Sequence, residues 1–215
     1  MDPSKVQNLL EQVAQGNTTV DAALAELRAL PYKELAEATI DQHRELRQGC
    51  PEVIYAESKT DEQVLAITEA LVREGQNVLV TRVLPSAAQA LEAQFPDARH
   101  VQSARTVRIE PSPAPSRDIP AVAVVCAGTS DIPVAEEAIE TLSAVGLPHE
   151  RVYDVGVAGL HRLLAKTTAL QSASAVIVVA GMEGALPSVI GGLVSGPVIA
   201  VPTSVGYGTN FGGLA

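Results

Sequence analysis

The chain has 215 residues, enough for one large domain or two modest ones with buried cores. Its net charge of −10 argues against nonspecific binding to nucleic acid or to anionic membranes, although helix N-terminal amides can still hold an anionic nucleotide. Cys50 and Cys126 form no CxxC pair, and the apolar runs are only strand-length. We therefore expect no zinc site, no disulfide framework and no membrane span. With no signal-peptide pattern at Met1, the expected location is the cytoplasm.

Residues 1–116 are predicted to form an N-terminal helical and small α/β domain. Two amphipathic helices come first, separated by a break at residues 16–19, and a short strand is possible at 38–41. The remaining pattern predicts strands at 52–55, at 77–81 and within 99–110, with helices at 61–74 and 85–94. The run 111–116, rich in Pro and Ser, is the clearest linker.

Residues 117–215 follow a strict βαβ rhythm. Strands are predicted at 120–126, 151–155, 174–180 and 197–201, and helices at 132–145, 158–169 and 185–193. Apolar strands that alternate with helices predict an α/β fold, a parallel sheet in a three-layer sandwich. Ligands bind such sheets at the carboxyl ends of the strands.

The first candidate site is the loop Gly128-Thr129-Ser130-Asp131, which follows the strand at 120–126. Ser130 or Asp131 is positioned as the N-cap of the next helix. Free amides and hydroxyls at a helix start can cradle a phosphate or a ribose. An ordinary turn with a capping Asp explains the pattern equally well.

Glu183 is the sharper signal. It is the single charged side chain between Gln171 and Ala215, and it lies in a glycine loop between Gly181 and Gly184. A carboxylate is costly to bury without a partner, so its place at the mouth of an apolar sheet suggests a functional group. The alternative is an exposed loop residue.

A third loop, residues 201–213, carries Ser204, Gly206 and Tyr207, which could stack a flat ring and bond its edges. A tail without function is the alternative. Arg162 lies near the start of the helix at 158–169 and could contact phosphate, or simply face solvent. The histidines share no metal-ligand spacing, so no metal site is predicted.

The second half resembles the PurE family of aminoimidazole ribonucleotide carboxylases and mutases, which have a flavodoxin-like sheet and form octamers. The loops Ala127–Val134 and Ala180–Ser188 occupy the places of that family's G-S-x-S-D and A-G-x-A-A-H-L-P-G elements. The histidine of the H-L-P element falls on Ala185, and residues 156–162 replace the S-A-H-R-T-P element. A PurE-type mutase is therefore disfavoured.

The whole chain resembles the LarB family, the PurE-like enzymes of nickel-pincer nucleotide cofactor synthesis. The resemblance rests on AGTSD-P-VAEEA, YDVGVAGLHRLL, VVAGMEGALPSV and VPTSVGYG, and on the segment from Asp41 to Tyr55. It implies that nicotinic acid adenine dinucleotide (NaAD) and the co-substrate CO2 are converted to pyridinium-3,5-biscarboxylic acid mononucleotide and AMP. It also implies no tightly bound cofactor, Mg²⁺ as a candidate aid to hydrolysis, and a homo-octamer.

In the chemistry implied by the resemblance, a cysteine thiolate adds to the pyridinium ring and the ring takes up CO2. A base then removes the ring proton, so that aromaticity returns and the thiolate leaves. Glu183 is assigned to the ring end as base or positioning group, and Gly128–Asp131 to phosphate and ribose, with Arg162 as a weaker candidate for the same anion. The family's cysteine lies in an N-S-C-A-P-G element beyond F-G-G-L-A, so neither Cys50 nor Cys126 takes that role. We expect the 215-residue chain to be truncated, with Phe211 and Leu214 poorly packed and carboxylation undetectable. A noncatalytic nucleotide-binding module is the alternative from a different class.

Overall fold

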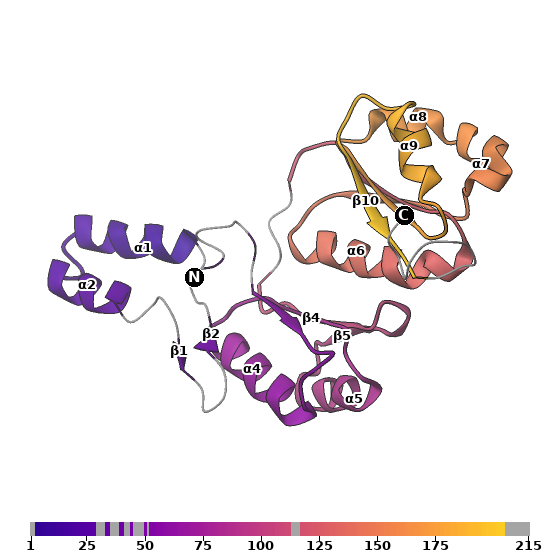
Figure 1. Cartoon of the computed structure of the whole chain (residues 1–215). Coiled ribbons are helices and arrows are strands. Elements are labelled where there is room, and N and C mark those ends of the chain that lie inside the picture. Colours follow the sequence, from indigo (N-terminus) through magenta and orange to yellow (C-terminus); the bar gives the residue numbers. More distant parts are fainter. Residues whose placement is uncertain are drawn as a thin grey trace. The chain divides into compact units, whose positions relative to one another are not determined.

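The computed structural model describes residues 3–28, 33–34, 39–40, 44, 50, 52–112 and 117–204. The chain divides into two compact units (Figure 1). The first unit comprises Met1–His100 and Thr106–Pro113, and the second comprises Val101–Arg105 and Ala114–Ala215. Part of the predicted linker, residues 113–116, lies outside the described residues.

The first unit begins with the two predicted helices, α1 (Pro3–Ala14) and α2 (Val20–Arg28). The strand expected at 38–41 is present as β2 (Thr39–Ile40), paired antiparallel with β1 (Lys33–Glu34). β1 was not predicted, because two polar residues carry no apolar alternation.

A four-stranded sheet follows in the order β3-β4-β6-β5, and β4 runs parallel to β3 and antiparallel to β6. The helices α4 and α5 contribute Leu71 and Leu91 to a core that also contains Val80 and Val107 from the sheet. The sheet and its helices are β3 (Val53–Tyr55), α4 (Asp61–Arg73), β4 (Val78–Thr81), α5 (Pro85–Gln94), β5 (Arg99–Val101), the 3-10 turn η1 (Gln102–Ala104) and β6 (Thr106–Ile109).

The second unit is built on a sheet of four parallel strands in the order β10-β9-β7-β8. The chain passes from β7 to β8 on one side and then crosses to β9 on the other, which is the flavodoxin-like order. The carboxyl ends of β7 and β9 therefore flank the topological switch point, where such sheets bind ligands. The strands are β7 (Val122–Cys126), β8 (His149–Val152), β9 (Ala175–Ala180) and β10 (Val198–Pro202).

Helices cover both faces of this sheet, and successive residues of β7 point to opposite sides. Val124 and Cys126 pack with Ile139 of α6 (Ile132–Ala144) in one core cluster. Ala123 and Val125 belong to a second cluster, with side chains from the remaining helices. Those helices are α7 (Leu160–Leu164), α8 (Thr167–Ser172) and α9 (Ala185–Gly191). The predicted α/β three-layer sandwich is confirmed.

One predicted helix, 158–169, is wrong as a single element. The chain forms the 3-10 turn η3 (Val157–Gly159), then α7, and then α8 after a break. At the break the Thr167 hydroxyl donates to the carbonyl of Leu164 at 2.8 Å, and the amide of Lys166 bonds Leu163. A side-chain bond of this kind offers the carbonyl an alternative to the helical ladder. Across the described residues, no helix is long and apolar enough to cross a membrane.

Candidate ligand-binding site

A cavity of about 200 Å³ opens in the second unit at the carboxyl ends of β7, β8 and β9. The loops that follow these three strands and the start of α9 form its walls. Its position is the switch point of the parallel sheet. The lining residues are Ala127, Gly128, Ser130, Asp131, Gly156, Val157, Ala158, Arg162, Ala180, Gly181, Met182, Glu183, Ala185 and Leu186.

Asp131 organises the loop after β7. Its Oδ2 accepts a hydrogen bond from the backbone amide of Gly128 at 3.0 Å, and its Oδ1 accepts one from the hydroxyl of Thr203 at 2.7 Å. The Asp131 and Thr203 side chains are both buried, so the carboxylate is held by two donors away from solvent. The bond to Thr203 ties the loop after β7 to the end of β10.

Asp131 occupies the N-cap position of α6, as expected. Residues Thr129–Asp131 form the 3-10 turn η2 ahead of α6, and the Asp131 side chain makes no capping bond to α6. It turns back to Gly128 instead. Thr129 is exposed and does not line the cavity, whereas Ser130 is exposed and does line it.

The loop after β8 packs tightly against the loop after β7. The amide of Gly156 donates to the carbonyl of Ala127 at 2.9 Å, and a Cβ at residue 156 would lie 2.9 Å from that same oxygen. Only glycine allows this approach without moving backbone. Asp154, two residues earlier, has a left-handed backbone with φ 57°, a conformation that Asp tolerates better than most residues.

Arg162 of α7 reaches the cavity wall and forms an ion pair with Asp154, between its Nη1 and the carboxylate Oδ2. Both side chains are partly exposed, at 41% for Arg162 and 52% for Asp154. The Arg162 guanidinium, which is predicted to contact phosphate, therefore lies at the cavity wall, but it is already paired with the Asp154 carboxylate.

The glycine loop after β9 brings Gly181 and Glu183 to the cavity. Met182 and Gly184 both have left-handed backbones, with φ 55° and 67°. Gly184 pays little for this conformation, but a side chain at Met182 carries strain of the kind that collects at functional sites. Gly184 itself does not line the cavity.

The Glu183 side chain is exposed at the cavity wall, and not buried at the mouth of the sheet. The desolvation argument for its function therefore fails, because water solvates the carboxylate. What singles Glu183 out is its place beside the cavity rather than its burial.

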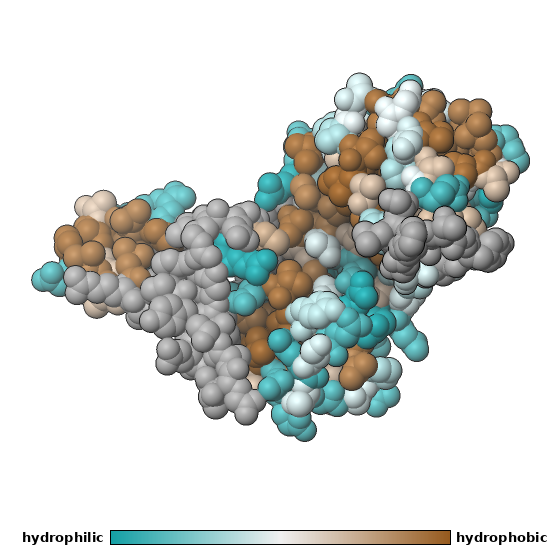
Figure 2. Space-filling model, viewed as in Figure 1, coloured by the Kyte–Doolittle hydropathy of each residue, from teal (hydrophilic) through white to brown (hydrophobic). Residues whose placement is uncertain are grey.

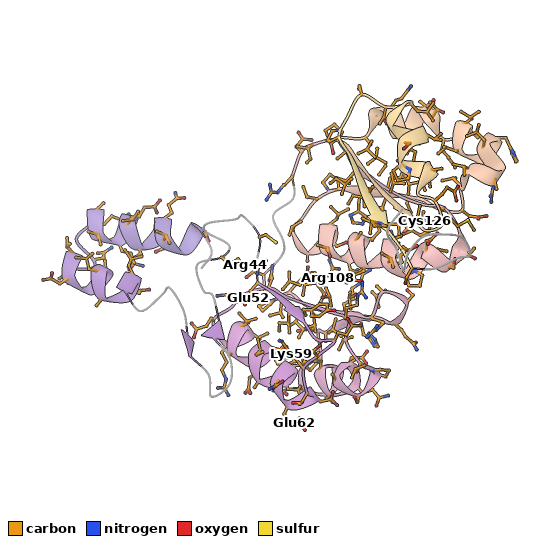
Figure 3. All side chains as sticks on the ribbon, in the orientation of Figure 1. Arg44, Glu52, Lys59, Glu62, Arg108 and Cys126 are labelled. Carbon is orange, nitrogen blue, oxygen red and sulfur yellow. The ribbon has the colours of Figure 1, made fainter. Side chains whose placement is uncertain are left out.

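Cys126 ends β7 in the core of the unit, with its side chain fully buried (Figure 3). Burial raises the pKa of the Cys126 thiol above its ordinary value, and the nearby Asp131 and Asp154 carboxylates add to the rise. Its Sγ lies 3.5 Å from the carbonyl of Gly128. Such a thiol is a core residue rather than a nucleophile.

Three charged side chains line the cavity, and they differ in what they can offer a ligand. The Asp131 carboxylate is held by Gly128 and Thr203, and the Arg162 guanidinium is paired with Asp154, whereas Glu183 is exposed. In the part of the chain that the structure describes, no group of three or more His, Cys, Asp or Glu side chains is arranged to hold a metal ion.

Sequence reasoning missed Asp154, Gly156, Gly159 and Thr203. The loop 128–131 is predicted as a site because polar residues and glycine follow an apolar strand. Residues 154–159 show a similar pattern, with an Asp and two glycines after a strand, so the same reasoning applies to them. Thr203 had no such signal, since its partner lies 72 positions earlier. Ser204 is exposed and does not line the cavity, and Gly206 and Tyr207 lie outside the described residues, as do Phe211 and Leu214.

The fold defines a flavodoxin-like α/β protein with a cavity at the switch point of its parallel sheet. Residues 32–111 match the family model of the LarB/PurE-like N-terminal domain, and residues 121–213 match that of AIR carboxylase. An uncharacterized protein of Methanocaldococcus jannaschii is 36% identical over 211 residues, covering 94% of this chain and 82% of the relative. The chain belongs to the LarB family of PurE-like proteins, as its sequence motifs predicted. Its function is of the carboxylase class.

Proposed function

We propose that this protein carboxylates the pyridinium ring of NaAD with CO2 and hydrolyses the phosphoanhydride. The products would be pyridinium-3,5-biscarboxylic acid mononucleotide and AMP, for nickel-pincer cofactor synthesis. Membership of the LarB family supports the reaction class. The observation that supports the choice of substrate is the exposed Glu183 carboxylate on the cavity wall, which also contains an arginine that is already paired with Asp154.

A pyridinium ring is a permanent cation, so a carboxylate beside it is attractive at any pH at which that carboxylate is ionised. Glu183, exposed on the loop after β9, lines the cavity, and we assign to it contact with the ring and removal of the ring proton that carboxylation releases. Asp131 is held by Gly128 and Thr203, and it keeps the loop after β7 in the shape that presents the hydroxyl of Ser130. That loop we assign to ribose and phosphate.

The attacking nucleophile of the cysteine-dependent route is not Cys126, which is buried and has a raised pKa. We assign that role to the N-S-C-A-P-G element of the family. Chemical turnover is assayed by incubating the protein with NaAD and labelled bicarbonate and following product mass.

The PurE-type mutase fits the cavity less well. Ala185 lines the cavity at the position where the H-L-P histidine of PurE falls, so the imidazole of that reaction has no counterpart there. Aminoimidazole ribonucleotide is also neutral at its ring and gains nothing from Glu183. The same mass assay with aminoimidazole ribonucleotide in place of NaAD distinguishes the two reactions.

Ring charge is tested by binding alone. Nicotinic acid mononucleotide and its 1,4-dihydro form have nearly the same shape, but only the first has a cationic ring. We expect calorimetry to show that the cationic form binds with the lower dissociation constant. Glu183→Gln should reduce the ratio of the two dissociation constants about fivefold, which is the effect expected of one nearby, partly solvated charge. Glu150→Gln, an exposed change on β8, is the matched control. Equal binding of both forms to the unaltered protein would count against a pyridinium substrate.

A further inference from the structure

Gly159 is a buried glycine whose backbone does not require glycine. Its φ is −122°, an angle that any residue adopts. It lies at the junction of η3 and α7, three residues before Arg162 on the cavity wall. The reason for glycine must therefore lie in the space around it.

That space is filled by the Arg162 guanidinium. A Cβ on residue 159 would lie 2.6 Å from Nε, 2.9 Å from Nη2 and 3.1 Å from Cζ of Arg162. The three nearest atoms all belong to this one side chain, and none belongs to backbone. The guanidinium thus folds back onto Gly159, while its Nη1 donates to Asp154 on the other side.

We propose that Gly159 is a positioning residue, whose missing side chain seats the Arg162 guanidinium so that it binds an anionic group of the ligand in the cavity. The inference rests on the proposed function for the identity of that ligand. Asp154 fixes one nitrogen of the guanidinium, and Gly159 fixes its plane. Arginine has five N–H donors, so the pair with Asp154 leaves others for a carboxylate or phosphate.

Gly159→Ala tests this positioning role without changing Arg162 itself. The backbone accepts alanine, but the guanidinium must move by several tenths of an ångström or change rotamer. We expect the dissociation constant of nicotinic acid mononucleotide to rise about tenfold, the loss expected when one charge-assisted contact is misaligned. Gly191→Ala is the matched control, because a Cβ there meets nothing within 4 Å.

A double-mutant cycle separates positioning from a structural effect. In an Arg162→Ala background the guanidinium is gone, so Gly159→Ala should cause no further loss of binding. An equal loss in both backgrounds, or wild-type binding by Gly159→Ala alone, would overturn the proposal. Melting temperature is measured in parallel, and we expect Gly159→Ala and Gly191→Ala to differ little.

Three ligands distinguish which anionic group of the substrate Arg162 binds. If Arg162 meets the ring carboxylate, Gly159→Ala erases the preference for nicotinic acid mononucleotide over nicotinamide mononucleotide. If it meets phosphate, both mononucleotides weaken equally, and nicotinic acid riboside, which lacks phosphate, is unaffected.

Inorganic pyrophosphate, followed by phosphorus NMR line broadening, keeps the test independent of the substrate. If pyrophosphate binds and Gly159→Ala weakens that binding, the positioning role of Gly159 is supported even when no pyridine nucleotide binds. Failure of the pyridine nucleotides to bind would then contradict only the proposed function. If the unaltered protein binds neither pyrophosphate nor nucleotide, both proposals are wrong.

Discussion

Cys126 shows how position within an element decides the chemistry of a residue. Its place in an apolar strand is the sequence context of a small core residue. The structure buries it completely against α6 and raises its pKa. The fraction present as thiolate at neutral pH is therefore small, and the thiolate is the reactive form.

We expect iodoacetamide to label Cys50, which is only partly buried, before Cys126 at pH 7. Because the pKa of Cys126 is raised above its ordinary value near 9, its labelling should accelerate only at more alkaline pH than a free thiol requires. Peptide mass mapping over time gives both rates, and unfolding in urea should make them equal. Labelling of Cys126 as fast as Cys50 in the folded protein would contradict the burial described here.

Much of the cavity could be anticipated from single residues. Loops that follow apolar strands predict Gly128, Ser130, Asp131, Gly181 and Glu183 as site residues, and a helix start predicts Arg162. The structure brings all six to one cavity. Their chemical roles stay predictions. Asp154 and Gly159 escaped notice because their importance depends on where the Arg162 side chain folds, and spacing along the chain does not encode that.

At the scale of elements, α6 and β8 are joined by side-chain hydrogen bonds among Glu136, Arg151 and Tyr153. Arg151 of β8 makes two bonds to Glu136 of α6, Nε to Oε1 at 2.8 Å and Nη2 to Oε2 at 3.0 Å. The hydroxyl of Tyr153 donates to the same Oε1 at 2.8 Å. These bonds lower the pKa of Glu136, and burial together with the Glu136 charge raises the pKa of Tyr153.

Glu136 should therefore make stability depend on pH. Its folded pKa is lower than its unfolded pKa of about 4.3, so the stabilisation is present above that pH and is lost as the pH falls through the folded pKa. We expect Glu136→Gln to lower the free energy of unfolding by about 1 kcal/mol at pH 7, allowing for the partial exposure of Arg151.

Urea unfolding at a series of pH values measures this difference. The gap between the unaltered protein and Glu136→Gln should stay constant above about pH 6 and narrow below about pH 4. Glu150→Gln, exposed on β8, is the control and should show no such gap. A gap independent of pH would mean that Glu136, Arg151 and Tyr153 act through packing alone.

The start of α4 in the first unit offers a second test at this scale. Thr60 accepts a bond from the amide of Gln63, and the Gln63 side chain accepts one from the amide of Thr60, which is a capping box. The Thr60 hydroxyl also lowers the pKa of Glu62, after the larger effect of a backbone hydrogen bond. Both Glu62 and the nearby Lys59 are labelled in Figure 3.

We expect Thr60→Ala to destabilise this unit by about 1 kcal/mol, the usual cost of losing an N-cap. Hydrogen exchange should quicken at the amides of the first turn of α4 and remain unchanged in the second unit. Ser58→Ala, an exposed change in the same loop, is the control. Unaltered exchange in Thr60→Ala would show that the capping box contributes little.

Elements with long apolar runs were predictable, and those decided by local bonds were not. α5 and β7 follow from their residue patterns to within two residues. The break between α7 and α8 falls at residues 165 and 166, where local bonds replace the regular ladder, among them the bond of the Thr167 hydroxyl to the Leu164 carbonyl. Sequence patterns average over a window and cannot register a single bond of this kind.

At the scale of the whole molecule, the second unit leaves large apolar side chains at its surface. Leu160 and Leu164 lie one turn apart on α7 and are 43% and 49% exposed, and Ile199 on the edge strand β10 is 52% exposed. Figure 2 shows hydrophobic residues at the surface of this unit. Exposed apolar surface of this kind is usually covered by another protein surface.

We therefore expect a homo-oligomer with closed symmetry, and the resemblance to the PurE family implies that it is an octamer. Light scattering should give eight times the 22.4 kDa mass of the chain at micromolar concentration. Leu164→Arg places a charge on the exposed face of α7 and should shift the protein toward smaller species. A monomer at micromolar concentration for the unaltered protein would exclude this assembly.

The hydrogen bond between Asp131 and Thr203 spans 72 positions of the chain, so it can form only after β10 has found its place beside β9. Closing such a long segment is slow, and contacts of this range are made late in folding. A ligand that needs the ordered Asp131 loop has nothing to bind before then. Saturating ligand should accordingly lengthen the lifetime of the folded protein and leave its refolding rate unchanged, which stopped-flow measurements in both directions can establish.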